Sequence, residues 1–137
     1  MFIALIGVSE FHKYFFDWAK KPEVKDAFTE NYAEIGNYLN SLPESTQKYV
    51  IVNELGYPLY GISIPAQTPM FIEYTEFGKL RATYLKAEEL NKIKLAGKII
   101  IIPLYENKIF EELQIKFPGG IIKQMNGFKT YEVGYSE

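Results

Sequence analysis

Two short apolar runs limit the folds open to this chain more than any other feature of its sequence. One run is Lys48–Asn53 (KYVIVN), and the other is Ile99–Ile102 (IIII). Both are continuous and do not alternate between apolar and polar side chains. Strands of this kind are covered on both faces, as in parallel sheets that carry helices on either side. The two runs therefore predict neighbouring buried strands at the centre of an α/β fold.

The stretch before the first run has the spacing of an amphipathic helix. Apolar residues recur at steps of three and four, and they are Val24, Phe28, Tyr32, Ile35, Leu39 and Leu42. This spacing places them on one face of a helix, which we expect over 22–42. Pro22 suits the first turn, and Pro43 ends the helix because the residue before a proline is pushed out of helical geometry.

Beyond the first run, strand and helix signals alternate. Glycines and prolines indicate a loop over 55–65, and Thr68-Pro69 predicts the start of a helix that reaches about Tyr74. Gly78 is the expected stop of this helix. A short strand over 80–85 and a short helix over 86–92 follow.

The C-terminal third repeats this alternation and then changes. We expect the second buried strand over 98–104, limited by Pro103, and a helix over 107–116. Asn126-Gly127 lies between two strand-like runs, 121–125 and 128–135, and this dipeptide is a strong hairpin signal.

Together these elements predict one α/β domain over 1–137. Strands that alternate with helices favour a mixed sheet with helices on both faces, which gives three layers. We expect two helices before the sheet and a β-hairpin at the C-terminal end of the domain.

Composition excludes several kinds of site. With no Cys, a single His (His12) and two Asp, the chain lacks the ligands for a usual zinc site, a thiol nucleophile or disulfides. Arg81 is the single arginine, which excludes a phosphate site built from several arginines. A net charge of −2 does not favour a nucleic-acid partner. No nucleotide-binding or serine-nucleophile motif is present, and we predict no metal and no cofactor.

The N-terminal residues allow two interpretations. Met1–Val8 (MFIALIGV) is apolar but far shorter than the roughly 20 residues that a membrane span needs. The pattern favours a first strand, and the alternative is that 1–9 is the stub of a membrane helix. An aromatic stripe follows on one face of a predicted helix over 10–20, formed by Phe11, Tyr14, Phe15 and Trp18. The stripe predicts core packing, and the alternative is a belt at a membrane surface.

Polar residues follow both buried strands, where ligands gather in open α/β sheets. The candidates for a ligand-binding site are Asn53, Glu54, Tyr57, Tyr105, Glu106 and Asn107. Glu54 and Glu106 are also candidates for a carboxylate pair in acid–base work. The simpler interpretation is that both are solvated loop residues.

Four segments carry a resemblance to a known family: YFFDWAK at 14–20, IGNYLNSLPESTQKYVIVN at 35–53, AQTPMFI at 66–72 and FPGG at 117–120. They resemble the soluble C-terminal region of membrane glycosyltransferases of the dolichyl-phosphate-mannose-protein mannosyltransferase-like superfamily. In those proteins a multi-spanning membrane part precedes an extracytoplasmic α/β domain. The resemblance extends from about Phe11 to Gly134 and includes no catalytic signature.

This resemblance implies that Met1–Val8 is the stub of the last membrane helix and that the aromatic stripe is juxtamembrane. The family's catalytic acidic residue belongs to an early loop of the membrane part, so no catalytic residue is carried over to this chain. The implied function is a non-catalytic extracytoplasmic domain that supports the membrane part or positions an acceptor or a lipid-linked sugar donor.

Two other functions stay open. The first is a free-standing cytoplasmic module that binds a small ligand or a partner protein. The second is a small hydrolase that uses Glu54 and Glu106. The sequence leaves the oligomeric state and the identity of the sugar open.

Overall fold

The computed structural model describes residues 11–13, 30–54, 56, 58–59 and 62–134. The chain divides into two units, Met1–Glu30 and Asn31–Glu137. In the first unit, residues 11–13 are helical and exposed. The predictions for Met1–Val8 and for Tyr14, Phe15 and Trp18 lie outside the described residues.

The second unit is built from strands that alternate with helices. In chain order the elements are α3 (Glu30–Ser41), β1 (Gln47–Val52), β2 (Pro58–Leu59), β3 (Ile62–Ser63), α4 (Ile64–Phe77), β4 (Thr83–Lys86), the 3-10 helix η2 (Ala87–Lys92), β5 (Ile99–Pro103), α5 (Ile109–Lys116), β6 (Ile121–Gln124) and β7 (Lys129–Val133). Five of the strands form one sheet in the order β4-β1-β5-β7-β6, and β2 pairs with β3 separately. The predicted α/β class with a mixed sheet is confirmed.

The two apolar runs lie side by side at the centre of the sheet. β1 pairs in parallel with β5, with Tyr49 opposite Ile101, and in parallel with β4, with Val50 opposite Tyr84. β7 runs antiparallel to both of its neighbours, and Tyr131 lies opposite Ile101 on one side and Ile122 on the other. The carboxyl ends of β1, β4 and β5 therefore meet at one edge of the sheet.

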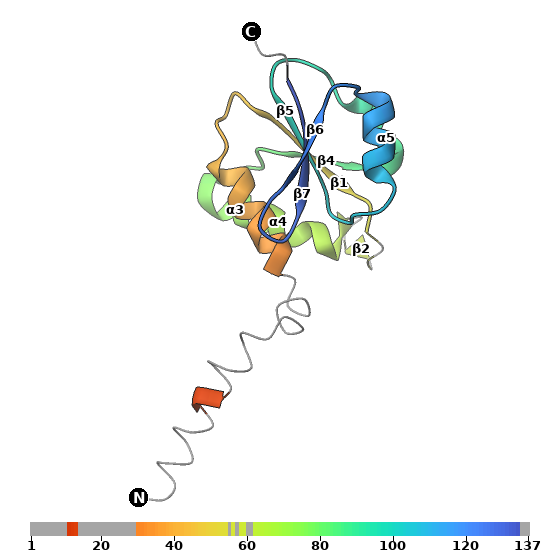
Figure 1. The fold of residues 1–137 in the computed structure, drawn as a ribbon. Coiled ribbons are helices and arrows are strands. Elements are labelled where there is room, and N and C mark those ends of the chain that lie inside the picture. Colours follow the sequence, from red (N-terminus) through yellow and green to blue (C-terminus); the bar gives the residue numbers. More distant parts are fainter. Residues whose placement is uncertain (1–10, 14–29, 55, 57, 60–61, 135–137) are drawn as a thin grey trace, which may run out of the picture. The chain divides into compact units, whose positions relative to one another are not determined.

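Each face of the sheet has its own apolar core. Val50 and Ile100 pack with Ile35 and Leu39 of α3 and Ala66 of α4. The alternate residues of the same strands form the other core, with Ile51, Ile99 and Ile101 packed against Leu90, Ile109 and Leu113. Figure 1 shows α3 and α4 on one side of the sheet and α5 on the other. Residues 99–102 have no solvent exposure, because both faces are covered.

Helix α4 begins earlier than the sequence predicts. We expected a loop over 55–65 and a helix start at Thr68, but β3 lies within that loop and α4 begins at Ile64. Pro65 occupies the first turn, where a missing N–H breaks no helical bond. The helix ends as predicted, because Gly78 adopts a φ of 66° and its N–H donates to the Tyr74 carbonyl at 2.8 Å.

Other boundaries also differ from prediction by a few residues. The described part of the helix expected over 22–42 is α3, which ends at Ser41, and residues 22–29 lie outside the described ranges. The strand expected over 80–85 is β4, which begins only at Thr83. It starts late because the N–H groups of Arg81 and Ala82 donate to the buried Glu73 carboxylate rather than to a neighbouring strand.

Candidate functional site

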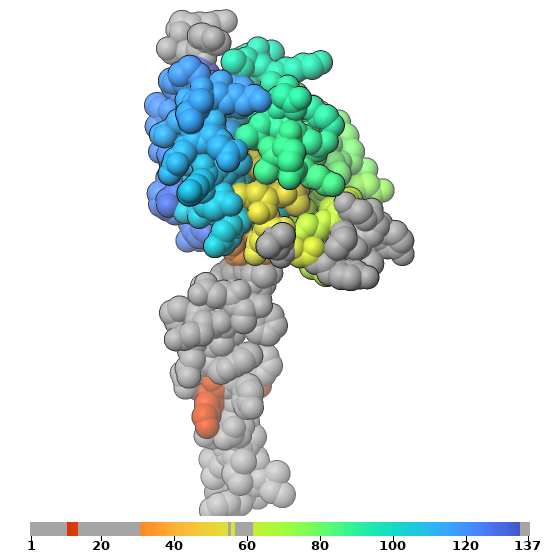
Figure 2. All heavy atoms as spheres, turned by 90° about the vertical axis from the view of Figure 1, so that its right-hand side faces the viewer, coloured from red at the N-terminus to blue at the C-terminus, as the bar shows by residue number. Residues whose placement is uncertain are grey.

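An open cavity of about 640 Å³ lies at the carboxyl ends of β1 and β4. It is lined by residues of β1, β3, α4, β4 and η2 and of the loops that follow β1 and β5: Val52, Asn53, Glu54, Gly56, Ile62, Ser63, Met70, Tyr84, Leu85, Lys86, Ala87, Glu88, Glu89 and Asn107. Figure 2 shows this region, where yellow atoms around the end of β1 lie between α5 and the green segment that includes η2. Ligands of open α/β sheets bind at this edge.

Asn53 joins the loops that follow the two central strands. Its side-chain amide donates to the Tyr105 carbonyl at 2.8 Å, and its side-chain oxygen accepts from the Tyr105 N–H at 3.0 Å. The same amide lies 3.4 Å from the side-chain oxygen of Asn107, which also accepts the Ile109 N–H at the start of α5. Asn53 and Asn107 thus fix one wall of the cavity, and their polar atoms are largely used by the protein itself.

Glu54 is the residue of this wall with unused hydrogen-bonding capacity. It is half-buried, and among the described residues its buried Oε2 atom has no hydrogen-bond partner. Burial raises the pKa of this carboxyl above its usual value, because a low-dielectric environment disfavours the charged form. A buried unsatisfied carboxylate oxygen is costly in a folded protein, which sets Glu54 apart from Asn53 and Asn107 in this wall.

The opposite wall is acidic. Glu88 and Glu89 at the start of η2 both line the cavity, and Lys86 is the lysine beside them. Glu89 is engaged, because its carboxylate accepts the Lys86 N–H at 3.0 Å and pairs with the Lys92 amine at 2.5 Å. Glu88 is exposed. The charges of the lining residues therefore favour a neutral ligand with hydroxyl groups, or a cationic one, over an anion.

The floor of the cavity is apolar. Val52, Ile62, Met70 and Leu85 line it, together with Tyr84. The Tyr84 hydroxyl donates to the Glu73 carboxylate at 2.9 Å, which fixes the orientation of the ring. Apolar side chains beside several hydrogen-bonding groups suit a ligand with one C–H face and one polar edge.

The structure brings together some of the residues that the sequence singled out. Asn53, Glu54 and Asn107 line one cavity, whereas Glu106 does not line it and pairs with Lys129 at 2.5 Å. Tyr105 contributes its backbone to the Asn53 contact, and its side chain is exposed. Tyr57 lies outside the described residues. Sequence reasoning missed Ser63, Tyr84 and Glu88, because no local pattern shows that η2 and β3 border the end of β1.

Fold and cavity together define the second unit as a small α/β domain with an open cavity at the carboxyl edge of its parallel strands. Comparisons with protein families, with curated proteins and with solved structures find no match. Within the described ranges, no helix has the length and apolarity that a membrane crossing requires. The same residues contain no cluster of His, Asp and Glu that could hold a metal ion.

Proposed function

We propose that this chain is a non-catalytic sugar-binding domain of a membrane glycosyltransferase. In this proposal it holds the sugar part of an acceptor or of a lipid-linked donor. The observation that carries the proposal is the cavity at the carboxyl ends of β1 and β4, with the half-buried Glu54 among its lining residues. The glycosyltransferase context rests on the sequence resemblance described above, which also implies an extracytoplasmic location.

The chemistry of the lining residues supports a sugar. A pyranose ring offers hydroxyl groups to carboxylates and amides, and it offers a C–H face to aromatic and aliphatic side chains. Glu54 and Glu88 supply acceptors, and Ile62, Met70 and Tyr84 supply apolar side chains. Glu106 is ion-paired with Lys129 and is absent from the lining, so the cavity geometry does not favour the hydrolase that uses two glutamates.

The proposal is tested by titrating the full ¹⁵N-labelled chain with neutral glycosides. Methyl mannoside, glucoside and galactoside are added to about 10 mM, which fills most of a site with a millimolar dissociation constant. We expect saturable shifts of the amide resonances of Ser63, Leu85 and Glu88. Glu54→Gln should weaken binding about ten-fold, because a hydrogen bond to a charged group contributes about 1.5–3 kcal/mol.

Glu111→Gln is the matched control, since it makes the same change on α5 at a residue outside the cavity. It should leave glycoside binding unchanged. The proposal is wrong if none of the glycosides shifts these resonances. It is also wrong if Glu54→Gln leaves the glycoside affinity unchanged. Cavity shifts caused only by charged ligands, such as amino acids or ATP, would instead favour the free-standing ligand-binding module.

A further inference from the structure

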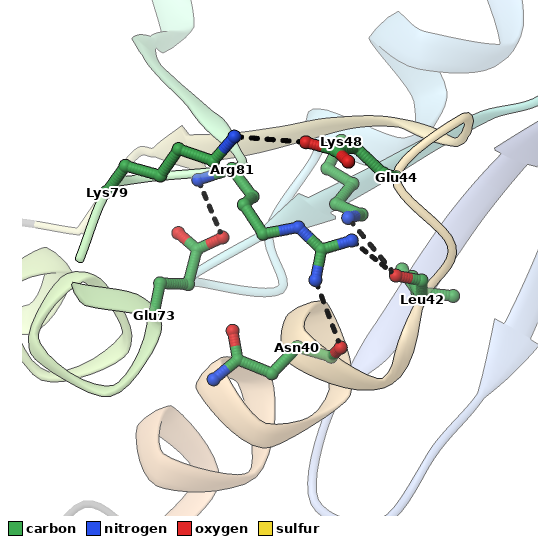
Figure 3. A network of polar contacts seen from close by, with 7 residues as sticks. All are labelled: Asn40, Leu42, Glu44, Lys48, Glu73, Lys79 and Arg81. Carbon is green, nitrogen blue, oxygen red and sulfur yellow. Dashed lines mark hydrogen bonds and ion pairs between the residues drawn. The ribbon is translucent and has the colours of Figure 1, made fainter. Parts of the chain in front are cut away.

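Three cationic side chains surround a second, smaller pocket at the other end of β1. The pocket has a volume of about 200 Å³ and is lined by Lys48, Lys79, Arg81, Glu44 and Leu80. Lys48 is the second residue of β1 and lies opposite Ile100 of β5. Lys79 and Arg81 precede β4. Figure 3 shows Lys48 and Arg81 converging on the chain segment that follows α3, with Lys79 and Glu44 beside them. This pocket is separate from the cavity at the carboxyl edge.

Lys48 carries a buried charge with few partners. The residue is only 3% exposed, and within the described part of the chain its amine has one hydrogen bond, to the Leu42 carbonyl at 3.3 Å. Arg81 donates to the same carbonyl oxygen at 2.8 Å, so two cations share one neutral acceptor. Burial lowers the pKa of the Lys48 amine, and the neighbouring Arg81 guanidinium lowers this pKa further.

The acidic groups nearby leave a net positive pocket. Glu73 is fully buried and is already bonded to the Arg81 and Ala82 N–H groups and to the Tyr84 hydroxyl. Glu44 pairs with Lys79 at 3.0 Å, but these side chains are 77% and 64% exposed. An ion pair this exposed is weak, so an incoming anion can displace the Glu44 carboxylate.

We propose that this pocket binds a phosphate group, with Lys48, Lys79 and Arg81 as its contacts and with Glu44 displaced. Ammonium and guanidinium groups that converge on a concave site are the usual ligands of phosphate oxygens. Apolar side chains lie beside the cations: Leu80, which lines the pocket, is 44% exposed, and Phe77 is 40% exposed with its ring centroid 4.3 Å from the Arg81 guanidinium carbon. The bound group is therefore a free phosphate or the phosphate of an amphiphile.

The competing explanation is that the cations only stabilise the end of α3. The last turn of α3 contains no basic residue, and Arg81 donates to the Asn40 and Leu42 carbonyls there. Positive charge at a helix C-terminus is stabilising without any ligand. The test must therefore change the pocket without removing these contacts. Glu44 and Lys79 allow this because both are exposed and, among the residues that the structure describes, their side chains bond to each other alone.

The full chain is titrated with inorganic phosphate at low salt, and binding is followed by calorimetry and by amide resonances of 79–82. Lys79→Gln should weaken binding about five-fold, and Glu44→Gln should strengthen it by a similar factor because the competing carboxylate is gone. Lys98→Gln removes an exposed lysine elsewhere and should change nothing. Absence of saturable binding, or a Glu44→Gln variant that binds phosphate no better, would show that the cluster is purely structural.

The source of the phosphate is distinguished with two further probes. Octyl phosphate should bind several-fold more tightly than inorganic phosphate if the apolar side chains beside the cations hold an alkyl chain, and phosphatidylcholine vesicles should then retain the protein only when they contain phosphatidic acid. Equal affinity for octyl and inorganic phosphate, with no vesicle binding, assigns the pocket to a free phosphate. Vesicle binding that survives Lys79→Gln unchanged would contradict the proposal.

Discussion

At the scale of single residues, Glu73 is a buried carboxylate that is held by several hydrogen bonds. Its carboxylate has no solvent exposure, and it accepts hydrogen bonds from Arg81 and Ala82 at the entrance to β4 and from Tyr84 within β4. Helix α4 is thereby fixed to the edge strand of the sheet. Tyr84 also lines the cavity, so the position of one cavity wall depends on this buried carboxylate.

We expect Glu73→Gln to lower the free energy of unfolding by about 2 kcal/mol. The amide keeps the size of the side chain but replaces one acceptor oxygen by a donor, which leaves a buried hydrogen-bonding group without a partner. Urea unfolding followed by circular dichroism measures this change. The same substitution at exposed Glu111 should change the free energy of unfolding by no more than about 0.5 kcal/mol. An equal effect at the two sites would show that the hydrogen bonds of Glu73 do not stabilise the fold.

The sequence predicts residue positions better than residue roles. Asn53 and Asn107 lie near each other because both follow central parallel strands, and this follows from the apolar runs alone. The unsatisfied Glu54 oxygen and the contacts of Arg81 depend on distances between elements that are far apart in the sequence. Nothing in the segment around Glu73 distinguishes it from exposed Glu76, because the two differ only in the face of α4 that they occupy.

At the scale of elements, α3 and α4 approach each other closely at Gly36. A Cβ atom built on Gly36 would lie 2.9 Å from the Cβ atom of Ile72, and 3.1 Å from two further atoms of that side chain. The Cβ atom of Ile72 is fixed to the backbone of α4, so rotation of a side chain cannot relieve the contact. The glycine therefore sets the distance between the two helices.

Gly36→Ala should destabilise the protein by about 1–3 kcal/mol, because the helices must move apart to admit the methyl group. Helix propensity alone gives the opposite sign, since alanine is favoured over glycine by about 1 kcal/mol within a helix. Thermal and urea unfolding decide between these two expectations.

A double-mutant cycle with Ile72→Ala supplies the control. It removes the two side-chain atoms at 3.1 Å, so Gly36→Ala should be less harmful in that background than in the wild type. A stabilising Gly36→Ala substitution in the wild type would contradict this prediction, because it would show that α3 and α4 can accommodate the added methyl group without moving apart.

Element types are easier to predict from this sequence than element boundaries. The apolar runs and the 3.6-residue period identify β1, β5 and α3 from local signals. The start of α4 was missed because Pro65 looks like a loop residue and Thr68-Pro69 looks like a helix start, although Pro65 occupies the first turn and Pro69 lies inside the helix. The late start of β4 reflects the contacts of Glu73, which a local pattern does not contain.

At the scale of the whole molecule, the sheet of the second unit is stabilised by two separate cores. Ile100 faces the core that includes α3 and α4, and Ile101 faces the core that includes η2 and α5. Both residues have no solvent exposure. Stability therefore depends on both sides of the sheet, as the continuous apolar runs of the sequence already imply.

Ile100→Val and Ile101→Val should each lower the free energy of unfolding by about 0.5–1.5 kcal/mol, because each removes one buried methylene group. Ile115→Val, at a residue that is 82% exposed, should have almost no effect. Chemical denaturation of the three variants measures the differences. A large effect at one of the two buried positions and none at the other would indicate a sheet that is packed on a single face.

The strand order has a consequence for how this protein folds as it is synthesised. β7 follows β6 in the chain but lies between β5 and β6 in the sheet. Once β5 has left the ribosome and before β7 has done so, the nascent chain can pair β1 with β4 and β5, yet one side of β5 has no hydrogen-bonding neighbour. The unpaired edge of such a strand can hydrogen-bond to a strand of another chain. Newly made molecules are therefore most prone to misassociation in the interval before Val133 leaves the exit tunnel.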